Sequence, residues 1–365
     1  SEHGLEMVRI PLAKTDIGLD EVAAVSQVME SGRLAFGPEL EQFERDFAVY
    51  HGVPGAVMIN SGTSALMISL LALGVGSGDE VIMPALTFVG TVNAILATGA
   101  TPVLVDVNAE TANISITSLK HAITERTKAF IPVHLYGLPA RMKDILEVAD
   151  GGKFKVIEDA CEAIGSIQGG LRVGAIGDAG VFGFYPNKVL TTGEGGMIIS
   201  NDEAFLSVCR SAINQGRSND DLITCPSYSL RGSELGAAIG RVQLASLEQR
   251  SLERQKIAEV YFESLSSIPK LGVFETTISR SWFTFPVILP QGIDRDEVML
   301  RLTERGIESA NYFPAIHTQH RYKNFVKVSG SLAVSEDLGN RVLCLPFWLY
   351  CCIRQLNRNK LLNSL

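Results

Sequence analysis

One lysine in this chain stands between an apolar run and a glycine-rich turn. Lys188 follows Val181-Phe-Gly-Phe-Tyr-Pro-Asn and precedes Val-Leu-Thr-Thr-Gly-Glu-Gly-Gly196. An amine in an apolar, water-poor pocket loses part of its preference for the charged form, so its neutral, nucleophilic form becomes available near neutral pH. Lys188 is therefore a candidate to form a Schiff base with an aldehyde, although by itself a solvated lysine at a strand-to-turn junction is the commoner interpretation.

Two carboxylates follow a short β-branched run in Lys155-Val-Ile-Glu-Asp159-Ala-Cys-Glu162. If this run is a strand, Asp159 lies at its carboxyl end, where open α/β sheets bind their ligands. A carboxylate there can keep a heteroaromatic ring nitrogen protonated, because a nearby opposite charge often shifts a pKa by about 1–3 units. The alternative is that Asp159 only caps a following helix.

A polar turn between a strand and an apolar helix is predicted at Ser61-Gly62-Thr63-Ser64. Unpaired N–H groups and the helix dipole at such a helix start can bind a phosphate. The P-loop spacing is absent, so an ordinary helix cap remains the alternative. Further along, Phe88 in Pro84-Ala-Leu-Thr87-Phe88 could lay its ring on a planar ligand, or it could be a core phenylalanine at a strand end.

Together these groups match the parts that hold pyridoxal 5′-phosphate (PLP): a phosphate site, a stacking aromatic ring, a ring-nitrogen carboxylate and an aldehyde-trapping lysine. The chain resembles the DegT/DnrJ/EryC1/StrS family of PLP-dependent, mostly nucleotide-sugar, aminotransferases over most of its length. Besides the residues above, the resemblance is carried by Gly37-Pro-Glu-Leu-Glu41, Gly78-Asp-Glu-Val81, Gly99-Ala-Thr-Pro102, Glu158-Asp159, Thr192-Gly-Glu-Gly-Gly196 and Tyr312-Phe-Pro-Ala-Ile-His317.

The resemblance implies a role for each matching residue. Lys188 is the Schiff-base lysine and proton shuttle, and Asp159 is the partner of the ring nitrogen. The remaining cofactor-binding residues implied are Gly62, Thr63 and Ser64 at the phosphate, Phe88 on the ring, and Glu162, Asn187 and Ser229 around it. The substrate-binding residues implied are His317, Tyr312 and Arg231.

Three positions depart from the family pattern. Gly183 stands where many members have a serine that reaches the phosphate, so one hydroxyl contact is missing. Ser229 replaces an asparagine that reaches the phosphate of a dimer partner, so this contact is lost or is made through water. Ala310 stands where an arginine is common, which leaves a substrate contact there in doubt.

Composition narrows the possible partners. The chain has 365 residues, 46% of them hydrophobic, with 32 basic and 40 acidic residues and a net charge of −8. This balance argues against a nucleic-acid surface. Six cysteines without metal spacing predict reduced thiols in a cytoplasmic protein without a metal site, and we expect no pairing of Cys351 with Cys352. We expect no signal peptide, and no apolar run reaches the roughly 18 residues of a membrane span.

Strand-like runs alternate with helical segments along the chain, which predicts a mostly parallel sheet covered by helices. With the family resemblance, the expected class is an α/β, fold-type-I PLP-dependent transferase: a large domain at 1–245 with a mostly parallel sheet between helices, and a smaller α+β domain at 246–365. One long helix over about Ser233 to Ser266 is expected to bridge the two.

The expected function is transfer of an amino group from an amino acid, L-glutamate, to a nucleotide-linked keto-sugar in amino-sugar, polysaccharide or glycoside biosynthesis. The resemblance also implies a homodimer with shared active sites. The alternatives are a PLP-dependent sugar dehydratase, a cyclitol aminotransferase, or a PLP-binding regulatory protein without catalysis. Lys188 argues against the family's dehydratases, which have histidine at this place, and the lack of a DNA-reading motif argues against a regulator.

Overall fold

The computed structural model describes residues 10–217, 222–223, 227–274 and 279–349, and both Cys351 and Cys352 lie outside this range. The helices are α1 (Leu19–Ser31), α2 (Pro38–His51), α3 (Gly62–Ala72), α4 (Val89–Ala97), α5 (Ile116–Ala122), α6 (Met142–Val148), α7 (Glu203–Ala212), α8 (Glu234–Ala245), α9 (Leu247–Leu265), α10 (Arg295–Glu304) and α11 (Ala333–Arg341). The strands are β1 (Gly55–Ile59), β2 (Glu80–Pro84), β3 (Thr101–Val105), β4 (Thr127–Phe130), β5 (Lys155–Asp159), β6 (Ile167–Gln168), β7 (Leu171–Arg172), β8 (Ala179–Gly183), β9 (Gly196–Ser200), β10 (Gly272–Val273), β11 (Phe285–Ile288), β12 (Lys327–Val328) and β13 (Val342–Leu345).

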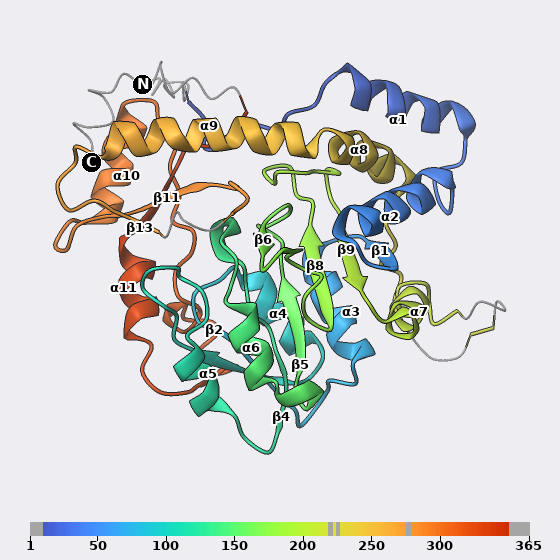
Figure 1. The fold of residues 1–365 in the computed structure, drawn as a ribbon, viewed down its shortest axis with the longest axis horizontal. Helices are drawn as coiled ribbons and strands as arrows, with labels where there is room; N and C mark the ends of the chain where they lie inside the picture. Colours follow the sequence, from blue (N-terminus) through green and yellow to red (C-terminus); the bar gives the residue numbers. More distant parts are fainter. Residues whose placement is uncertain (1–9, 218–221, 224–226, 275–278, 350–365) are drawn as a thin grey trace, which may run out of the picture.

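An eight-stranded sheet in the order β1-β9-β8-β5-β4-β2-β3-β12 organises the larger part of the molecule (Figure 1). All pairings from β8 to β12 are parallel, whereas β9 runs antiparallel to both of its neighbours. The strand β1 therefore points the same way as the parallel strands. As a result, β1, β2, β4, β5 and β8 all end at the same edge of the sheet, which is the edge where ligands bind in such folds.

Alternating side chains bury both faces of this sheet. In β2, Val81 and Met83 pack in one cluster with residues of α3 and α4, whereas Ile82 packs in another cluster with residues of α5 and α6. Because successive strand residues point to opposite faces, a strand that is apolar throughout must be covered by helices on both sides. The predicted mostly parallel sheet between helices is confirmed.

The long helix predicted over Ser233 to Ser266 is two helices, α8 and α9, separated at Ser246. The Ser246 hydroxyl lies 3.3 Å from the carbonyl oxygen of Val242 and accepts a hydrogen bond from Arg250 Nε at 2.8 Å. Serine side chains compete in this way for backbone groups, which favours a break. Helix α9 then extends from α8 toward β11 and β13 (Figure 1).

The smaller antiparallel sheet β10-β11-β13 packs with α9 and α10 around an aromatic cluster that includes Tyr261, Trp282, Phe285 and Phe347. This matches the expected α+β character of the C-terminal part. Two connections cross the proposed boundary at residue 246: β12 pairs with β3 of the large sheet, and Ile10 pairs with Ile307. The domain boundary itself stays a prediction.

Helix α9 is long enough, at 19 residues, to be considered as a membrane span, but it carries Glu248, Arg250, Glu253 and other charges. Within the described ranges, no helix combines the length and the apolar character that crossing a membrane requires.

Candidate active site

Two adjoining cavities, of about 50 and 530 Å³, open at the carboxyl edge of the large sheet. Asp159 and Thr91 line only the smaller cavity, and aromatic residues such as Tyr185 and Phe283 line only the larger one. The residues that line both cavities are Gly62, Thr63, Phe88, Cys161, Glu162 and Lys188. Four segments far apart in the sequence thus meet at one place.

Lys188 lies in the turn after β8, with its amine directed at the junction of the two cavities. Its Nζ lies 3.5 Å from Glu162 Oε1 and 4.1 Å from the centre of the Phe283 ring, and the side chain is 17% exposed. The apolar, partly dry surroundings expected from the sequence are therefore present on one side of the amine. On the other side of the amine, the Glu162 carboxylate lies close enough to exchange a proton with it.

Glu162 is buried and has two separate partners. One carboxylate oxygen faces Lys188, and the other accepts a hydrogen bond from the backbone N–H of Tyr136 at 2.9 Å. Burial raises the pKa of Glu162, and the positive charge of Lys188 opposes this rise. Glu162 and Lys188 thus form an ion pair in the wall that the two cavities share.

Asp159 is the last residue of β5 and points into the smaller cavity. Its Oδ2 accepts a hydrogen bond from Thr91 Oγ1 at 2.8 Å, and Oδ1 accepts one from the backbone N–H of Cys161 at 3.3 Å. Residues 160–166 form turns, so no helix follows that Asp159 could cap. The structure thereby removes the helix-cap alternative and leaves a fixed, buried carboxylate in the cavity wall.

The first turn of α3 forms a narrow cradle beside Cys161. A Cβ atom on Gly62 would lie 2.7 Å from Cys161 Sγ and 3.2 Å from Gly183 Cα, so the backbone approaches this wall as closely as only glycine allows. Thr63 lines both cavities. Ser64 does not line them; its N–H donates to Ser61 Oγ at 3.1 Å, and its hydroxyl lies 3.0 Å from the same oxygen.

Phe88 projects over the cavities at the start of α4. Its side chain is 55% exposed, which excludes the alternative of a core phenylalanine. The ring centre lies 5.6 Å from that of Phe313. A planar ligand in the smaller cavity would meet the exposed Phe88 ring.

The other expected site residues divide into two groups. Asn187 and Tyr312 line the larger cavity. Ser229, Arg231 and His317 line neither cavity: Ser229 is exposed, Arg231 donates to Asn214 Oδ1 at 2.9 Å, and the Nε2 atom of His317 lies 2.8 Å from Glu336 Oε1. Within the described part of this single chain, the lysine, the carboxylates, the cradle and the aromatic rings therefore lie together. Ser229, Arg231 and His317 lie apart from them.

Several residues of the site were not identified from the sequence. Thr91 holds Asp159, the Tyr136 N–H holds Glu162, Cys161 closes the cradle, and Phe283 packs on the lysine. Thr91 lies one helical turn after Phe88, which was a local signal. Phe283 is nearly 100 residues beyond Lys188 in the chain, and no spacing pattern connects the two.

These residues fit a bound PLP group. Gly62 has no side chain to fill the start of α3 beside Cys161, so a phosphate can approach the backbone there. Asp159 and Phe88 would hold the ring nitrogen and the ring face, and Lys188 would bind the aldehyde. In this site the cofactor would supply an electron sink for a carbanion.

Comparison with known proteins agrees with this geometry. Residues 15–357 match the model of the DegT/DnrJ/EryC1/StrS aminotransferase family. GDP-perosamine synthase of Escherichia coli O157:H7 is 34% identical over 346 residues, which cover 93% of each chain. Among solved structures, DesV of S. venezuelae is 34% identical, with a TM-score of 0.88 and coverage of 95% of this chain and 93% of that one.

A third relative shows the cofactor itself. GDP-4-keto-6-deoxy-D-mannose-3-dehydratase of E. coli, solved with bound hydrated PLP, is 26% identical, with a TM-score of 0.90 and coverage of 98% of this chain and 100% of that one. The geometry of the site and these similarities agree on one conclusion: the chain belongs to the DegT/DnrJ/EryC1/StrS family of PLP-dependent sugar aminotransferases.

Proposed function

We propose that this enzyme moves an amino group from L-glutamate, through PLP, to a keto-sugar attached to a nucleotide, for amino-sugar, polysaccharide or glycoside biosynthesis. The observation that carries the proposal is the amine of Lys188 at the junction of the two cavities, 3.5 Å from Glu162. An amine between the cavity lined by Asp159 and the larger open one is in reach of groups bound on either side of it.

The residues around the lysine have separate tasks in this proposal. With PLP bound, Lys188 would hold and move a proton at its Nζ, and Glu162 would accept or return the proton that the amine must lose to act as a base. Asp159, held by Thr91, keeps the ring nitrogen protonated.

The larger cavity is suited to a sugar nucleotide. At about 530 Å³ it falls within the range of small-molecule sites. Its wall includes Tyr185, Tyr312 and Phe313, which offer aromatic faces to a sugar ring and hydroxyl groups to its polar edge. A relative named GDP-perosamine synthase supports a nucleotide-linked substrate.

A sugar dehydratase is the second candidate, because the similar E. coli protein carries that name. Lys188 favours transamination. A dehydratase that replaces the lysine with histidine cannot capture the aldehyde in the same way. A cyclitol ketone as acceptor would leave all the residues above in the same roles.

We also propose a cytoplasmic homodimer with shared active sites. Ser229 and Arg231 lie away from this chain's own cavities, and Ser229 is exposed, as needed for contact with a neighbouring site. Helix α1 also exposes Leu19 and Met29, at 85% and 56%, which would favour a covering partner. A phosphate dianion needs more donors than the cradle at Gly62 and Thr63 provides, so donors from a second chain fit.

The test is to incubate the purified enzyme with L-glutamate and a panel of nucleotide keto-sugars, and to detect an amino-sugar by mass. We expect an amino-sugar to form only when L-glutamate and one of the nucleotide keto-sugars are both present. Lys188→Ala should lower turnover by at least about 10²–10⁴-fold, the contribution of a positioned proton-transfer group. A dehydrated sugar without nitrogen, or full turnover in Lys188→Ala, would refute the assignment.

A further inference from the structure

A second carboxylate lies directly behind Asp159. Glu158 and Asp159 are consecutive residues of β5, so their side chains point to opposite faces of the sheet. Asp159 faces the cofactor cavity, and Glu158 faces the protein interior with 0% of its surface exposed. A buried carboxylate one residue from a cofactor-binding one requires a physical explanation, because an unpaired charge there would be costly.

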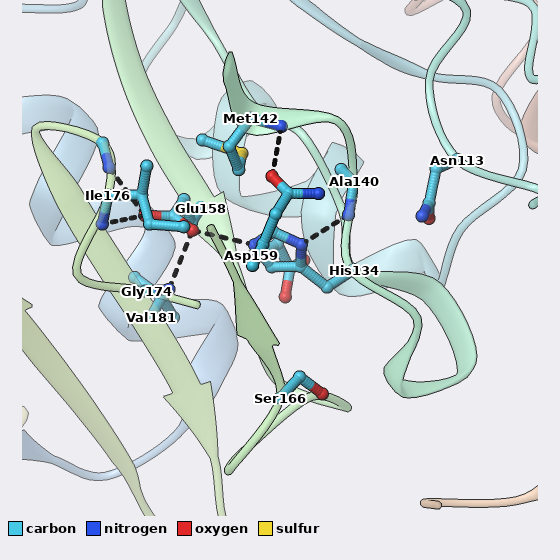
Figure 2. A network of polar contacts seen from close by, with 12 residues as sticks. Asn113, His134, Ala140, Met142, Glu158, Asp159, Ser166, Gly174, Ile176 and Val181 are labelled. Carbon is cyan, nitrogen blue, oxygen red and sulfur yellow. Dashed lines mark hydrogen bonds and ion pairs between the residues drawn. The ribbon is translucent and has the colours of Figure 1, made fainter. Parts of the chain in front are cut away.

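Backbone N–H groups and the His134 ring surround the Glu158 carboxylate (Figure 2). The backbone N–H groups of Ile176 and Gly177 both donate to Oε1 at 2.7 Å, and the N–H of Gly174 donates to Oε2 at 2.8 Å. His134 Nε2 approaches the same Oε2 at 2.9 Å. The three backbone partners of this carboxyl group are donors, so both of its oxygens act as acceptors.

His134 is fixed in one tautomer by its two neighbours. The backbone N–H of Ala140 donates to Nδ1 at 2.9 Å, so Nδ1 is an acceptor and the ring proton lies on Nε2, from which it is donated to Glu158 (Figure 2). The ring is 0% exposed and has both nitrogens satisfied. His134 therefore connects the loop at 134–140 to Glu158 through one rigid ring.

The same segment holds the end of β5. The backbone N–H of His134 donates to the carbonyl oxygen of Asp159 at 3.0 Å, and the N–H of Asp159 donates to the carbonyl oxygen of Pro132 at 2.9 Å. Two residues after His134, the N–H of Tyr136 donates to Glu162. The backbone of segment 132–136 thus holds the main chain of Asp159 and the carboxylate of Glu162.

We propose that His134 and Glu158 form a positioning pair, which sets the direction of the Asp159 carboxylate toward the cofactor ring. The pair does not touch the cofactor. It acts by fixing strand β5 against the loop at 134–140 on one side and the turn at 174–177 on the other. The inference rests on the proposed role of Asp159, but it does not depend on the identity of the sugar.

Substitutions at His134 separate the two hydrogen bonds of its ring. His134→Gln keeps a donor in place of Nε2, His134→Asn keeps an acceptor in place of Nδ1, and His134→Leu removes both. In each variant we follow the release of PLP from the holoenzyme on dilution, the pH dependence of its visible absorbance, and kcat. His134→Leu should release PLP about 10–100-fold faster, by analogy with the effect of residues that orient a metal-ligating side chain, with smaller effects in the other two.

A double-mutant cycle tests whether His134 acts through Asp159. If it does, His134→Leu should have little further effect on PLP release in an Asp159→Ala background, because the group that it positions is gone. Additive effects in the two backgrounds would overturn the proposal. Glu158→Gln, which puts an amide among four donors, provides a second variant if His134→Leu does not fold, and it should show the same dependence on Asp159.

Glu80→Gln is the matched control. Glu80 is also a buried carboxylate with several partners, among them Thr124 and Lys327, but it begins β2 and therefore lies at the opposite edge of the same sheet. Its substitution should lower stability and leave PLP release and the absorbance profile unchanged. If His134→Leu lowers only stability, as Glu80→Gln does, the pair is structural and the proposal is wrong.

Discussion

Alanine at Gly62 would place a methyl group in the wall of the cradle. The new Cβ would lie 2.7 Å from Cys161 Sγ and 3.2 Å from Gly183 Cα. Since ordinary contact between such atoms begins near 3.5 Å, the helix start or the thiol must move by about 1 Å. Gly62 does not have a positive φ, so the effect is steric and does not come from backbone strain.

Two magnitudes follow from this displacement. Overpacking of a tight site costs about 1–3 kcal/mol of unfolding free energy. A displacement of about 1 Å at reacting groups can cost about 10²-fold in rate, so turnover should fall more than stability does. The N–H groups at the start of α3 move with Gly62, and PLP should bind more weakly as well.

The assay compares three variants by urea unfolding, PLP binding and turnover. Cys161→Ala alone should have a smaller effect than Gly62→Ala, because it removes an atom from the cradle wall without creating a clash, and the hydrogen bond of Sγ to the Val181 carbonyl oxygen is long, at 3.9 Å. Gly62→Ala should show the losses above, and the double variant should recover most of them because Sγ is absent. Native PLP binding and turnover in Gly62→Ala would refute the cradle, and a double variant no better than Gly62→Ala would refute the clash with Cys161 as the cause.

Three further outcomes test other parts of the site. Asp159→Asn keeps the shape and removes the charge, so PLP should bind weakly and transamination should be lost; native activity would show that the charge is not needed. Burial raises the pKa of Glu162 above 4.5, against the effect of Lys188, so the native state holds this proton more tightly than the unfolded chain does, and the resulting stability is lost as pH rises through the raised pKa. In urea unfolding of the apoprotein, the stability of Glu162→Gln relative to the native chain should therefore rise as the pH is raised above about 4.5; a difference that does not change with pH would contradict the raised pKa. Mixing a Lys188→Ala chain with one substituted at Ser229 and Arg231 should restore one active site per heterodimer; no recovery in verified heterodimers, or a fully active monomer in sedimentation, would exclude shared sites.

The sequence predicted the site residues whose chemical type and position at a strand end, a helix start or a turn are both visible in the local sequence. Asp159 ends a strand, Gly62 begins a helix, and Lys188 lies in a turn, so their types and neighbours together indicated a cofactor site. The structure brings them to one edge because the parallel strands end there. The alternation of strands and helices predicted the mostly parallel sheet, and the family resemblance supplied the fold type.

Contacts between distant segments could not be predicted in this way. Nothing near Lys188 indicates that Phe283 packs on it, and nothing near Glu158 indicates four donors from two loops. The break at Ser246 was missed because a helical pattern continues on both sides of it, and a single serine hydroxyl decides the geometry. These features depend on tertiary packing, which a local pattern does not record.

The pairing of β12 with β3 affects how the chain can fold during its synthesis. Lys327 and Val328 join the edge of a sheet whose neighbouring strand ends at Val105. At 5–20 residues per second, the ribosome needs roughly 10–40 s to make the chain between them, and during this time the edge of β3 lacks its partner. An unpaired strand edge can pair with another chain, so the nascent protein is most exposed to aggregation before the C-terminal segment emerges.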